Sequence, residues 1–181
     1  MVARILNIKE PGLNVLPPGV ERYVINGGGL TGIQIFPEDE IEIINNDGNQ
    51  ICEISVFNKD GKSELGILNL KENKSNSQIK KILLKKDESS RTAVYQLKKR
   101  NLDIAKSKSA TVFTKDVNWG EKIKLNSKDK CYCIFAAPGS EMLIHEQSPP
   151  TDLTVFVKRA KITNDKELSV IPDPMFDPLS E

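Results

Sequence analysis

Short runs of β-branched and aromatic residues, separated by turn-forming residues, fill positions 20 to 70. Ile41 and Ile43 alternate with Glu40 and Glu42, which places apolar and acidic side chains on opposite faces of one strand. The pattern predicts strands at these runs: Tyr23–Ile25, Ile33–Phe36, Ile41–Ile44, Ile51–Phe57 and Leu65–Leu70.

Two Asp-Gly pairs separate the later runs of this series. Asp47-Gly48 lies between the third and fourth runs, and Asp60-Gly61 lies between the fourth and fifth. Asp-Gly favours the positive φ angles of tight hairpins. We therefore predict a hairpin at each pair, with Gly48 at positive φ.

The middle of the chain has a different pattern. Residues 71–100 contain ten basic and three acidic residues. Ile79, Ile82 and Leu83 follow the i, i+3, i+4 spacing of one helical face, and Val94 and Leu97 do the same in a second stretch. These spacings predict a two-helix insertion near residues 76–100.

Alternating strand patterns then resume and continue to about residue 157. Breaks occur at Asn118–Gly120, Ser127–Lys130, Pro138-Gly139 and Pro149-Pro150. The predicted strands are Thr111–Thr114, Lys122–Leu125, Tyr132–Ala136, Glu141–Ile144 and Leu153–Val157. About ten short strands at this spacing are typical of a mainly β barrel or sandwich, here with the two-helix insertion.

Proline clusters mark both ends of the predicted domain. Pro11-Gly12 and Pro17–Gly19 favour an irregular N-terminal arm over residues 1–20. Pro172, Pro174 and Pro178 prevent regular structure near the other end. We expect a β-rich domain over residues 21–170 and a Pro/Asp linker or tail over residues 171–181.

Composition narrows the class of protein. The 181 residues are 38% hydrophobic and 28% charged, which argues against wholesale disorder. The net charge of +1 predicts no overall attraction to nucleic acid or to membranes. The first residues lack the pattern of a signal peptide, and the three cysteines are an odd number. We expect a cytoplasmic protein with reduced thiols.

One glycine-rich run matches a nucleotide-binding pattern literally. Gly27-Gly28-Gly29-Leu30-Thr31-Gly32 fits G-x-G-x-x-G, but the dinucleotide mechanism requires a helix after the motif. A predicted strand and Pro37 follow instead. We therefore interpret the run as a turn or bulge between strands.

The cysteines offer two interpretations. Cys131 and Cys133 share one face of a strand, and together with Cys52, Glu53, His145 or Glu146 they could supply ligands for zinc. Cys-x-Cys is not a zinc-finger spacing, however, and cysteine is often a small buried hydrophobe. We favour buried structural thiols and keep zinc as the alternative.

The segment from residue 145 to 152 is the densest polar cluster next to a predicted strand. His145 is the single histidine of the chain, and no Gly-x-Ser-x-Gly elbow is present to supply a serine nucleophile. Such a loop either binds a ligand at the mouth of a β-fold or is a plain connector. Our candidate ligand-binding residues are Glu53, His145, Glu146 and Asp152; no catalytic residue is assigned.

Glu53 is a candidate because of its position within a predicted strand. It lies on the strand face opposite Cys52, Ile54 and Val56. If those three fill the core, Glu53 faces either solvent or a cavity, and a carboxylate in a cavity needs partners. We predict that Glu53 and His145 line one pocket; the alternative is an exposed Glu53.

The basic residues of the predicted helices favour a solvated surface. Tyr95 is the one aromatic residue in the stretch, and RNA-binding signatures are absent. A surface that meets an acidic neighbouring domain is the alternative to a solvated helix face.

Two segments resemble the urea carboxylase-associated family. Gly48-Asn49-Gln50, then Glu53, then Phe57-Asn58 resembles its core signature, in which the acidic position is usually Asp. Gln147–Val155 is similar to its late proline-containing segment, and residues 37–43 resemble the turn and strand before the signature. The resemblance covers residues 20–70 and 130–160. The metal-binding cysteine pattern of the family is not clearly reproduced here.

The resemblance implies a role in one-carbon or amine metabolism. Domains of this family also occur in front of folate-dependent aminomethyltransferases that resemble the glycine-cleavage T protein. The resemblance therefore implies that this chain is an accessory N-terminal domain that binds a small ligand or packs on a following catalytic domain. Alternatives are a stand-alone small-molecule or metal-dependent enzyme of the family, and a pure interaction module. No aminomethyltransferase domain fits in 181 residues, so we do not expect this chain alone to be catalytic.

Overall fold

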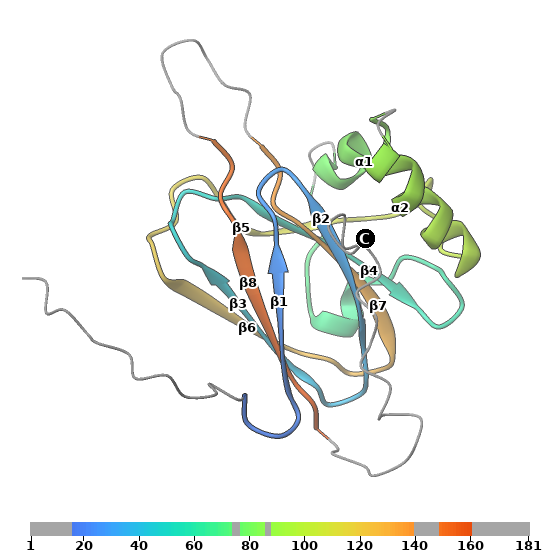
Figure 1. Ribbon diagram of the computed structural model, residues 1–181. Helices are drawn as coiled ribbons and strands as arrows, with labels where there is room; N and C mark the ends of the chain where they lie inside the picture. Colours follow the sequence, from blue (N-terminus) through green and yellow to red (C-terminus); the bar gives the residue numbers. More distant parts are fainter. Residues whose placement is uncertain (1–15, 74–76, 86–87, 140–148, 161–181) are drawn as a thin grey trace, which may run out of the picture.

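The computed structural model describes residues 16–73, 77–85, 88–139 and 149–160. This part of the chain forms eight strands in two antiparallel sheets (Figure 1). Sheet A has the order β1-β8-β3-β6, and sheet B has the order β2-β7-β4-β5. The strands are β1 (Val20–Ile25), β2 (Leu30–Ile35), β3 (Glu40–Asn45), β4 (Cys52–Asn58), β5 (Ala110–Phe113), β6 (Glu121–Asn126), β7 (Cys131–Ala136) and β8 (Leu153–Lys158). The predicted mainly β class is confirmed, in its sandwich form.

The chain crosses between the two sheets at nearly every connection. The one exception is the connection from β4 to β5, which stays within sheet B and carries the helices. Eight strands in two four-stranded sheets with this order have the topology of a jelly roll. Strands that are neighbours in sequence therefore rarely pair, which local turn signals cannot reveal.

The hairpin predicted at Asp47-Gly48 is wrong for this reason. Gly48 does adopt a positive φ of 76°, as predicted. However, β3 pairs with β6 and β8, whereas β4 pairs with β5 and β7. The turn therefore carries the chain from one sheet to the other. At Asp60-Gly61 the chain does reverse tightly, with Gly61 at φ 76° and a bridge between Phe57 and Ser63.

The inward faces of the two sheets form the main core. Cys52, Ile54 and Val56 of β4 share one strand face, as the alternation predicted, and the structure buries that face in the core. They pack with inward residues of the other strands, such as Ile43 and Val155. Glu53, Ser55 and Phe57 consequently point to the opposite, outer face of sheet B.

Two helices cover that outer face (Figure 1). They are α1 (Gln78–Leu83) and α2 (Glu88–Lys99), and they confirm the predicted two-helix insertion. Ile79, Leu83 and Leu97 of the helices pack with Phe57 and Ile134 of the sheet in a second hydrophobic cluster. This cluster fixes the helical hairpin on the sandwich.

Three other expectations concern local elements. The predicted strand at Leu65–Leu70 is wrong: Leu65–Leu68 is a short 3-10 helix, ended by Asn69 in the left-handed conformation. It buries Leu65, Ile67 and Leu68, so its apolar run reflects core packing rather than strand pairing. Gly27 and Gly28 form the turn between β1 and β2, as interpreted from the sequence. The predicted strand Glu141–Ile144 lies outside the described residues.

Candidate functional site

The two family-like segments meet at one end of the sandwich, where the connections β1–β2, β3–β4 and β7–β8 come together. Gln50 belongs to the first segment and follows β3 after a short turn. Thr151 and Asp152 belong to the second segment and precede β8. Side-chain hydrogen bonds join the two segments across about a hundred residues of sequence. We call this region the Gln50 end.

The carboxamide of Gln50 is the centre of these contacts. Its Oε1 accepts a hydrogen bond from the backbone N–H of Thr151 at 2.8 Å. Its Nε2 donates to the carbonyls of Pro138 and Ile51, each at 2.9 Å. The Gln50 side chain is buried, with 4% exposure, and the backbone carbonyl of Gln50 accepts from Asn45 Nδ2 at 2.7 Å. One amide group therefore holds both Pro138 and Thr151, on either side of residues 139–150.

Asp152 and Asn46 extend the network to the β1–β2 turn. Asp152 Oδ1 accepts from the backbone N–H of Gly27 at 2.8 Å. Asn46 Nδ2 donates to the Asp152 carbonyl at 3.2 Å and to Thr154 Oγ1 at 3.0 Å. Asp152, a predicted ligand-binding residue, thus has one carboxylate oxygen bound within the fold, while its side chain remains exposed.

Two buried polar atoms at the Gln50 end have no hydrogen-bond partner among the described residues. They are Asn45 Oδ1 and Thr151 Oγ1. Buried polar atoms in folded proteins almost always have a partner, so each exception needs a reason. Both atoms lie next to Gln50 in the network: Asn45 Oδ1 can accept a hydrogen bond, and the Thr151 hydroxyl can accept or donate one.

Glu53 lies elsewhere, on the outer face of sheet B beneath α1. It is 2% exposed, so the alternative of an exposed Glu53 is wrong. Its Oε1 accepts from the Ser77 hydroxyl at 2.6 Å, and its Oε2 accepts from the backbone N–H of Gln78 at 2.7 Å. The partners of this buried carboxylate are therefore the first groups of α1, where a helix favours negative charge. Ser77 Oγ in turn accepts from Lys80 N at 3.3 Å and caps the helix.

The remaining predicted ligand residues, His145 and Glu146, lie outside the described residues. The shared pocket of Glu53 and His145 stays a prediction. The structure does join the flanks of the segment that contains His145 to Gln50, through Pro138 and Thr151. Glu53 is held separately, by α1.

The cysteines are buried and free, in accordance with structural thiols. Cys131 Sγ and Cys133 Sγ lie 3.7 Å apart, closer than the spacing of alternate residues along a strand suggests. The hydrogen bond from Cys133 lowers the pKa of the Cys131 thiol, while burial raises that of Cys133. Within the ranges that the structure describes, no group of three His, Cys, Asp or Glu side chains could hold a metal ion.

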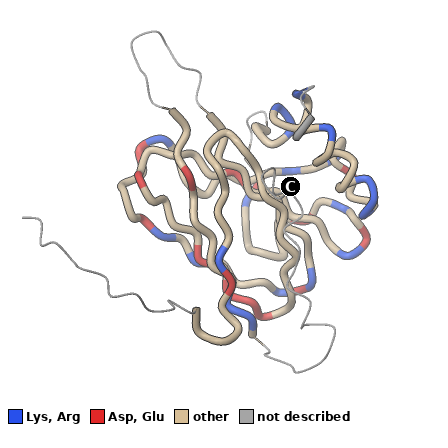
Figure 2. The backbone as a smooth tube through the Cα atoms, viewed as in Figure 1, with Lys and Arg blue, Asp and Glu red and all other residues tan. Residues whose placement is uncertain are grey.

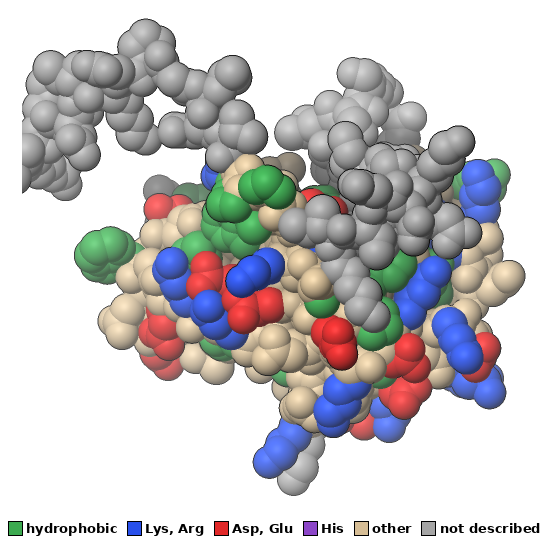
Figure 3. Space-filling view, turned by 90° about the horizontal axis from the view of Figure 1, so that it is seen from below, with side chains coloured by type: hydrophobic (Ala, Val, Ile, Leu, Met, Phe, Trp, Pro, Cys, Tyr) green, Lys and Arg blue, Asp and Glu red, His purple; other side chains and the backbone are tan. Residues whose placement is uncertain are grey.

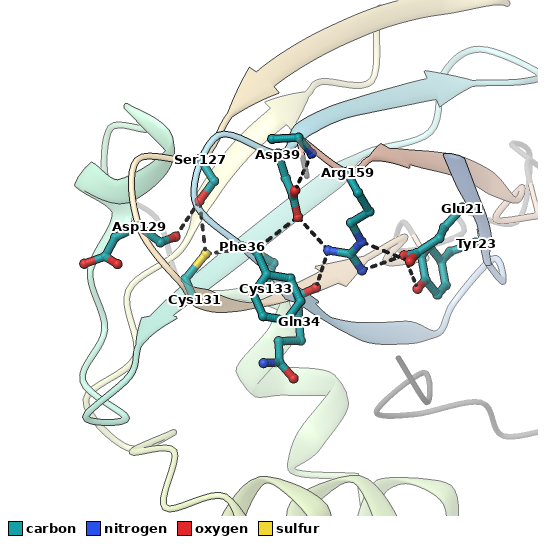
Figure 4. Close-up of polar contacts among 11 residues, drawn as sticks. Glu21, Tyr23, Gln34, Phe36, Asp39, Ser127, Asp129, Cys131, Cys133 and Arg159 are labelled. Atoms are coloured by element: carbon teal, nitrogen blue, oxygen red, sulfur yellow. Dashed lines mark hydrogen bonds and ion pairs between the residues drawn. The ribbon is translucent and has the colours of Figure 1, made fainter. Parts of the chain in front are cut away.

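A second polar cluster surrounds Arg159, just after β8 (Figure 4). Its guanidinium forms ion pairs with Asp39 at 2.6 Å and Glu21 at 2.5 Å, and it donates to the Gln34 carbonyl at 3.0 Å. Asp39 also accepts from the backbone N–H of Phe36 and of Ala160. This cluster ties β1, β2 and β8 together, and every described oxygen of its carboxylates has a partner within the fold.

The sequence interpretation missed the most connected residues. Gln50 entered it as part of a family-like signature without a role, and Asn46, Asp39 and Arg159 were not singled out. Their contacts join residues more than a hundred positions apart, so only the spacing of the two family-like segments hinted at them.

No helix in the described part of the chain is long and apolar enough to cross a membrane.

Comparison with known proteins gives one informative relative. No protein-family model matches the chain. The chain is 30% identical over 174 residues to a trimethylamine-oxide aldolase from Ruegeria pomeroyi. The alignment covers 96% of this chain but 22% of the relative, so this chain spans about a fifth of the relative's length. Over nearly its whole length, the chain is thus similar to one part of a larger enzyme that acts on an amine oxide.

Proposed function

We propose that this chain is the β-sandwich module of an amine-metabolising enzyme system, of the urea carboxylase-associated type. In this proposal it works beside a catalytic unit similar to folate-dependent aminomethyltransferases. The match to 22% of a trimethylamine-oxide aldolase, over 96% of this chain, supports the amine-metabolising part of the proposal. The family type and the catalytic unit beside it rest on the resemblance of the two sequence segments. A sandwich that corresponds to a fifth of an enzyme is expected to contribute binding or positioning to it.

The Gln50 end is the proposed ligand-binding region of the module. The two family-like segments meet there, and two buried polar atoms have no described partner. Loops at one end of a rigid β-sandwich are a common place for binding residues. Asp152 lies in this region, and His145 and Glu146 belong to the segment whose flanks Gln50 holds. The proposed ligand is a small amine or amine oxide.

Glu53 has a different role in this proposal. Both of its oxygens already bind the start of α1, so it holds the helical hairpin on sheet B. A carboxylate used in this way supports the fold rather than the ligand. The proposal therefore places recognition at the Gln50 end and attachment of the helices at Glu53.

Calorimetry with the purified chain tests the proposal. We expect trimethylamine oxide or dimethylamine to bind, and Gln50→Glu to weaken binding at least fivefold. The matched control is Gln34→Glu, because the Gln34 carboxamide makes no hydrogen bond within the described residues. A formaldehyde assay on the same samples is expected to show no turnover.

Each other result has a definite meaning. Turnover by the chain alone would contradict the accessory role and favour a stand-alone enzyme. Absence of binding to both compounds would contradict the ligand-binding role and leave an interaction module. Binding that survives Gln50→Glu unchanged would move the ligand away from the Gln50 end.

A further inference from the structure

The outward side of the helical hairpin carries an unusual set of exposed residues. On α2, Arg91, Tyr95 and Lys98 follow each other at i, i+4 and i+7, so they line one helix face. Leu84 and Tyr95 are large apolar side chains with 78% and 64% exposure. We call the following set the basic face: Lys81, Leu84, Lys85, Arg91, Tyr95, Lys98 and Lys99.

The cations of the basic face have no carboxylate partner in the part of the chain that the structure describes. The exposed lysines of sheet A differ in this respect, because Lys122 and Lys124 form ion pairs with Glu40 and Glu42. In Figure 2 the charged positions along α1 and α2 are mostly Lys and Arg, whereas Figure 3 shows acidic and basic side chains interleaved at the end seen from below. The basic face is therefore suited to an acidic occupant with apolar residues.

The chain itself contains a segment of that composition, outside the described residues. Positions 167–181 contain four acidic residues and no lysine or arginine. Three of the acids, Asp173, Asp177 and Glu181, recur every fourth position. Met175, Phe176 and Leu179 lie between them. We call residues 167–181 the acidic tail.

We propose that the acidic tail docks on the basic face of the same chain. Pro172, Pro174 and Pro178 favour the extended polyproline conformation, which rises about 3.1 Å per residue. Asp173 and Asp177 are then about 12 Å apart. On α2, Arg91 and Lys98 are about 10 Å apart along the axis, at ~1.5 Å per residue. In the sequence, Phe176 lies between Asp173 and Asp177, and Tyr95 lies between Arg91 and Lys98.

The length of the chain allows this contact. The described structure ends at Ala160, next to Asp39, whose carboxylate accepts a hydrogen bond from the Ala160 N–H. Twelve residues separate Ala160 from Asp173, and they can span about 40 Å when extended. A domain of this size has a radius of gyration of about 15 Å, so the hairpin is within reach.

Zero-length carbodiimide cross-linking of the full chain, mapped by mass spectrometry, tests the proposal. We expect links from Asp173, Asp177 or Glu181 to Lys81, Lys85, Lys98 or Lys99. Mixing isotope-labelled and unlabelled chains separates links within one chain from links between copies. The yield should fall several-fold between 50 mM and 500 mM salt, because exposed charge pairs are screened.

Charge variants make the test specific. K98E/K99E should lower the yield of links to the remaining lysines of the face at least threefold, and D173K/D177K should lower the yield from Glu181. K115E/K128E is the control, because both lysines are exposed, lie outside α1 and α2 in the sequence and form no ion pair in the described structure. Circular dichroism confirms that each variant is folded. Docking should also protect the tail, which is measured as slower proteolysis after residue 160. K98E/K99E combined with D173K/D177K exchanges the charges of the face and the tail, and it should restore this protection.

Three results would overturn the proposal. Links found solely between copies would assign the face to a second chain. A tail that forms no links to the face while the lysines stay reactive would leave the face to another partner, such as an acidic protein or RNA. Links whose yield is unchanged in K98E/K99E would show that contact with the face is random.

Discussion

The carboxamide oxygen of Gln50 lies 2.8 Å from the backbone nitrogen of Thr151, 101 positions later in the chain. The same carboxamide donates to the Pro138 carbonyl, so one side chain joins the β3–β4 connection to both flanks of the β7–β8 connection. A buried amide used on both its oxygen and its nitrogen cannot be replaced by a group that only accepts. This relationship makes Gln50 the residue whose substitution best tests the Gln50 end.

Gln50→Glu should destabilise the protein by about 1–3 kcal/mol, because a carboxylate oxygen would face the carbonyls of Pro138 and Ile51. Urea denaturation measures the change, and hydrogen exchange at the Thr151 amide reports whether the loop contact persists. Gln34→Glu, at a side chain outside the network, should change the stability by less than about 0.5 kcal/mol. Equal effects of the two variants would contradict a special role for Gln50.

Glu53→Gln should loosen α1 from the sandwich. The amide group keeps one acceptor but presents a donor to either the Ser77 hydroxyl or the Gln78 N–H, so we expect a loss of about 1–3 kcal/mol. Hydrogen exchange should accelerate in α1 more than in the strands of sheet A. Glu40→Gln, at an exposed ion pair with Lys124, is the control and should cost less than about 1 kcal/mol. An α1 that exchanges as in the wild type would remove the capping role of Glu53.

Gly48 and Gly120 separate the cost of backbone conformation from the cost of crowding. Both have positive φ, 76° and 71°, but a Cβ at Gly48 would lie 2.7 Å from Trp119 N, while one at Gly120 meets nothing within 4 Å. Gly120→Ala should therefore cost about 1–2 kcal/mol, the ordinary penalty of the left-handed conformation. Gly48→Ala should cost more, and Gly48→Val more again. Thermal denaturation of the three variants checks this order, and equal melting midpoints for Gly48→Ala and Gly120→Ala would refute it.

Stability should fall at alkaline pH. Burial, together with the hydrogen bond to Glu21, raises the pKa of the Tyr23 hydroxyl above its ordinary value of 10.0. Burial and the neighbouring Glu53 likewise raise the pKa of the Cys52 thiol above 9.0. Below these ordinary values both groups are protonated in the folded and unfolded states, and their contribution is fully present. As the pH rises beyond them, the unfolded chain loses its protons first, so the contribution is progressively lost.

Urea midpoints at pH 8, 9, 10 and 10.5 measure this loss. Each group lowers the free energy of unfolding by up to about 1.4 kcal/mol per pH unit above its ordinary pKa. Tyr23→Phe removes the contribution of Tyr23, and its stability curve should therefore be flatter above pH 10. Parallel curves for the wild type and Tyr23→Phe would show that Tyr23 does not carry the effect.

Local patterns in the sequence located most of the elements of the fold. Alternation at Ile41 and Ile43 located β3, the helical spacing at Ile79 and Leu83 located α1, and glycine located the left-handed turn at Gly48. Alternation also placed Cys52, Ile54 and Val56 on one strand face, opposite Glu53, because neighbours along a strand point to opposite sides. These properties depend on residues a few positions apart, so they are visible in the pattern.

The pairing of the strands and the contacts between distant polar groups depend on the tertiary structure. The turn at Asp47-Gly48 joins two sheets rather than two paired strands, because the partners of β3 come from β6 and β8. Glu53 could have met His145, a lysine or solvent, and the packing of α1 on sheet B selected Ser77 and Gln78 for it. Gln50 and Thr151 meet because the jelly-roll order brings distant connections to one end of the sandwich. Contacts of this kind depend on the global arrangement of the strands, which no local pattern in the sequence specifies.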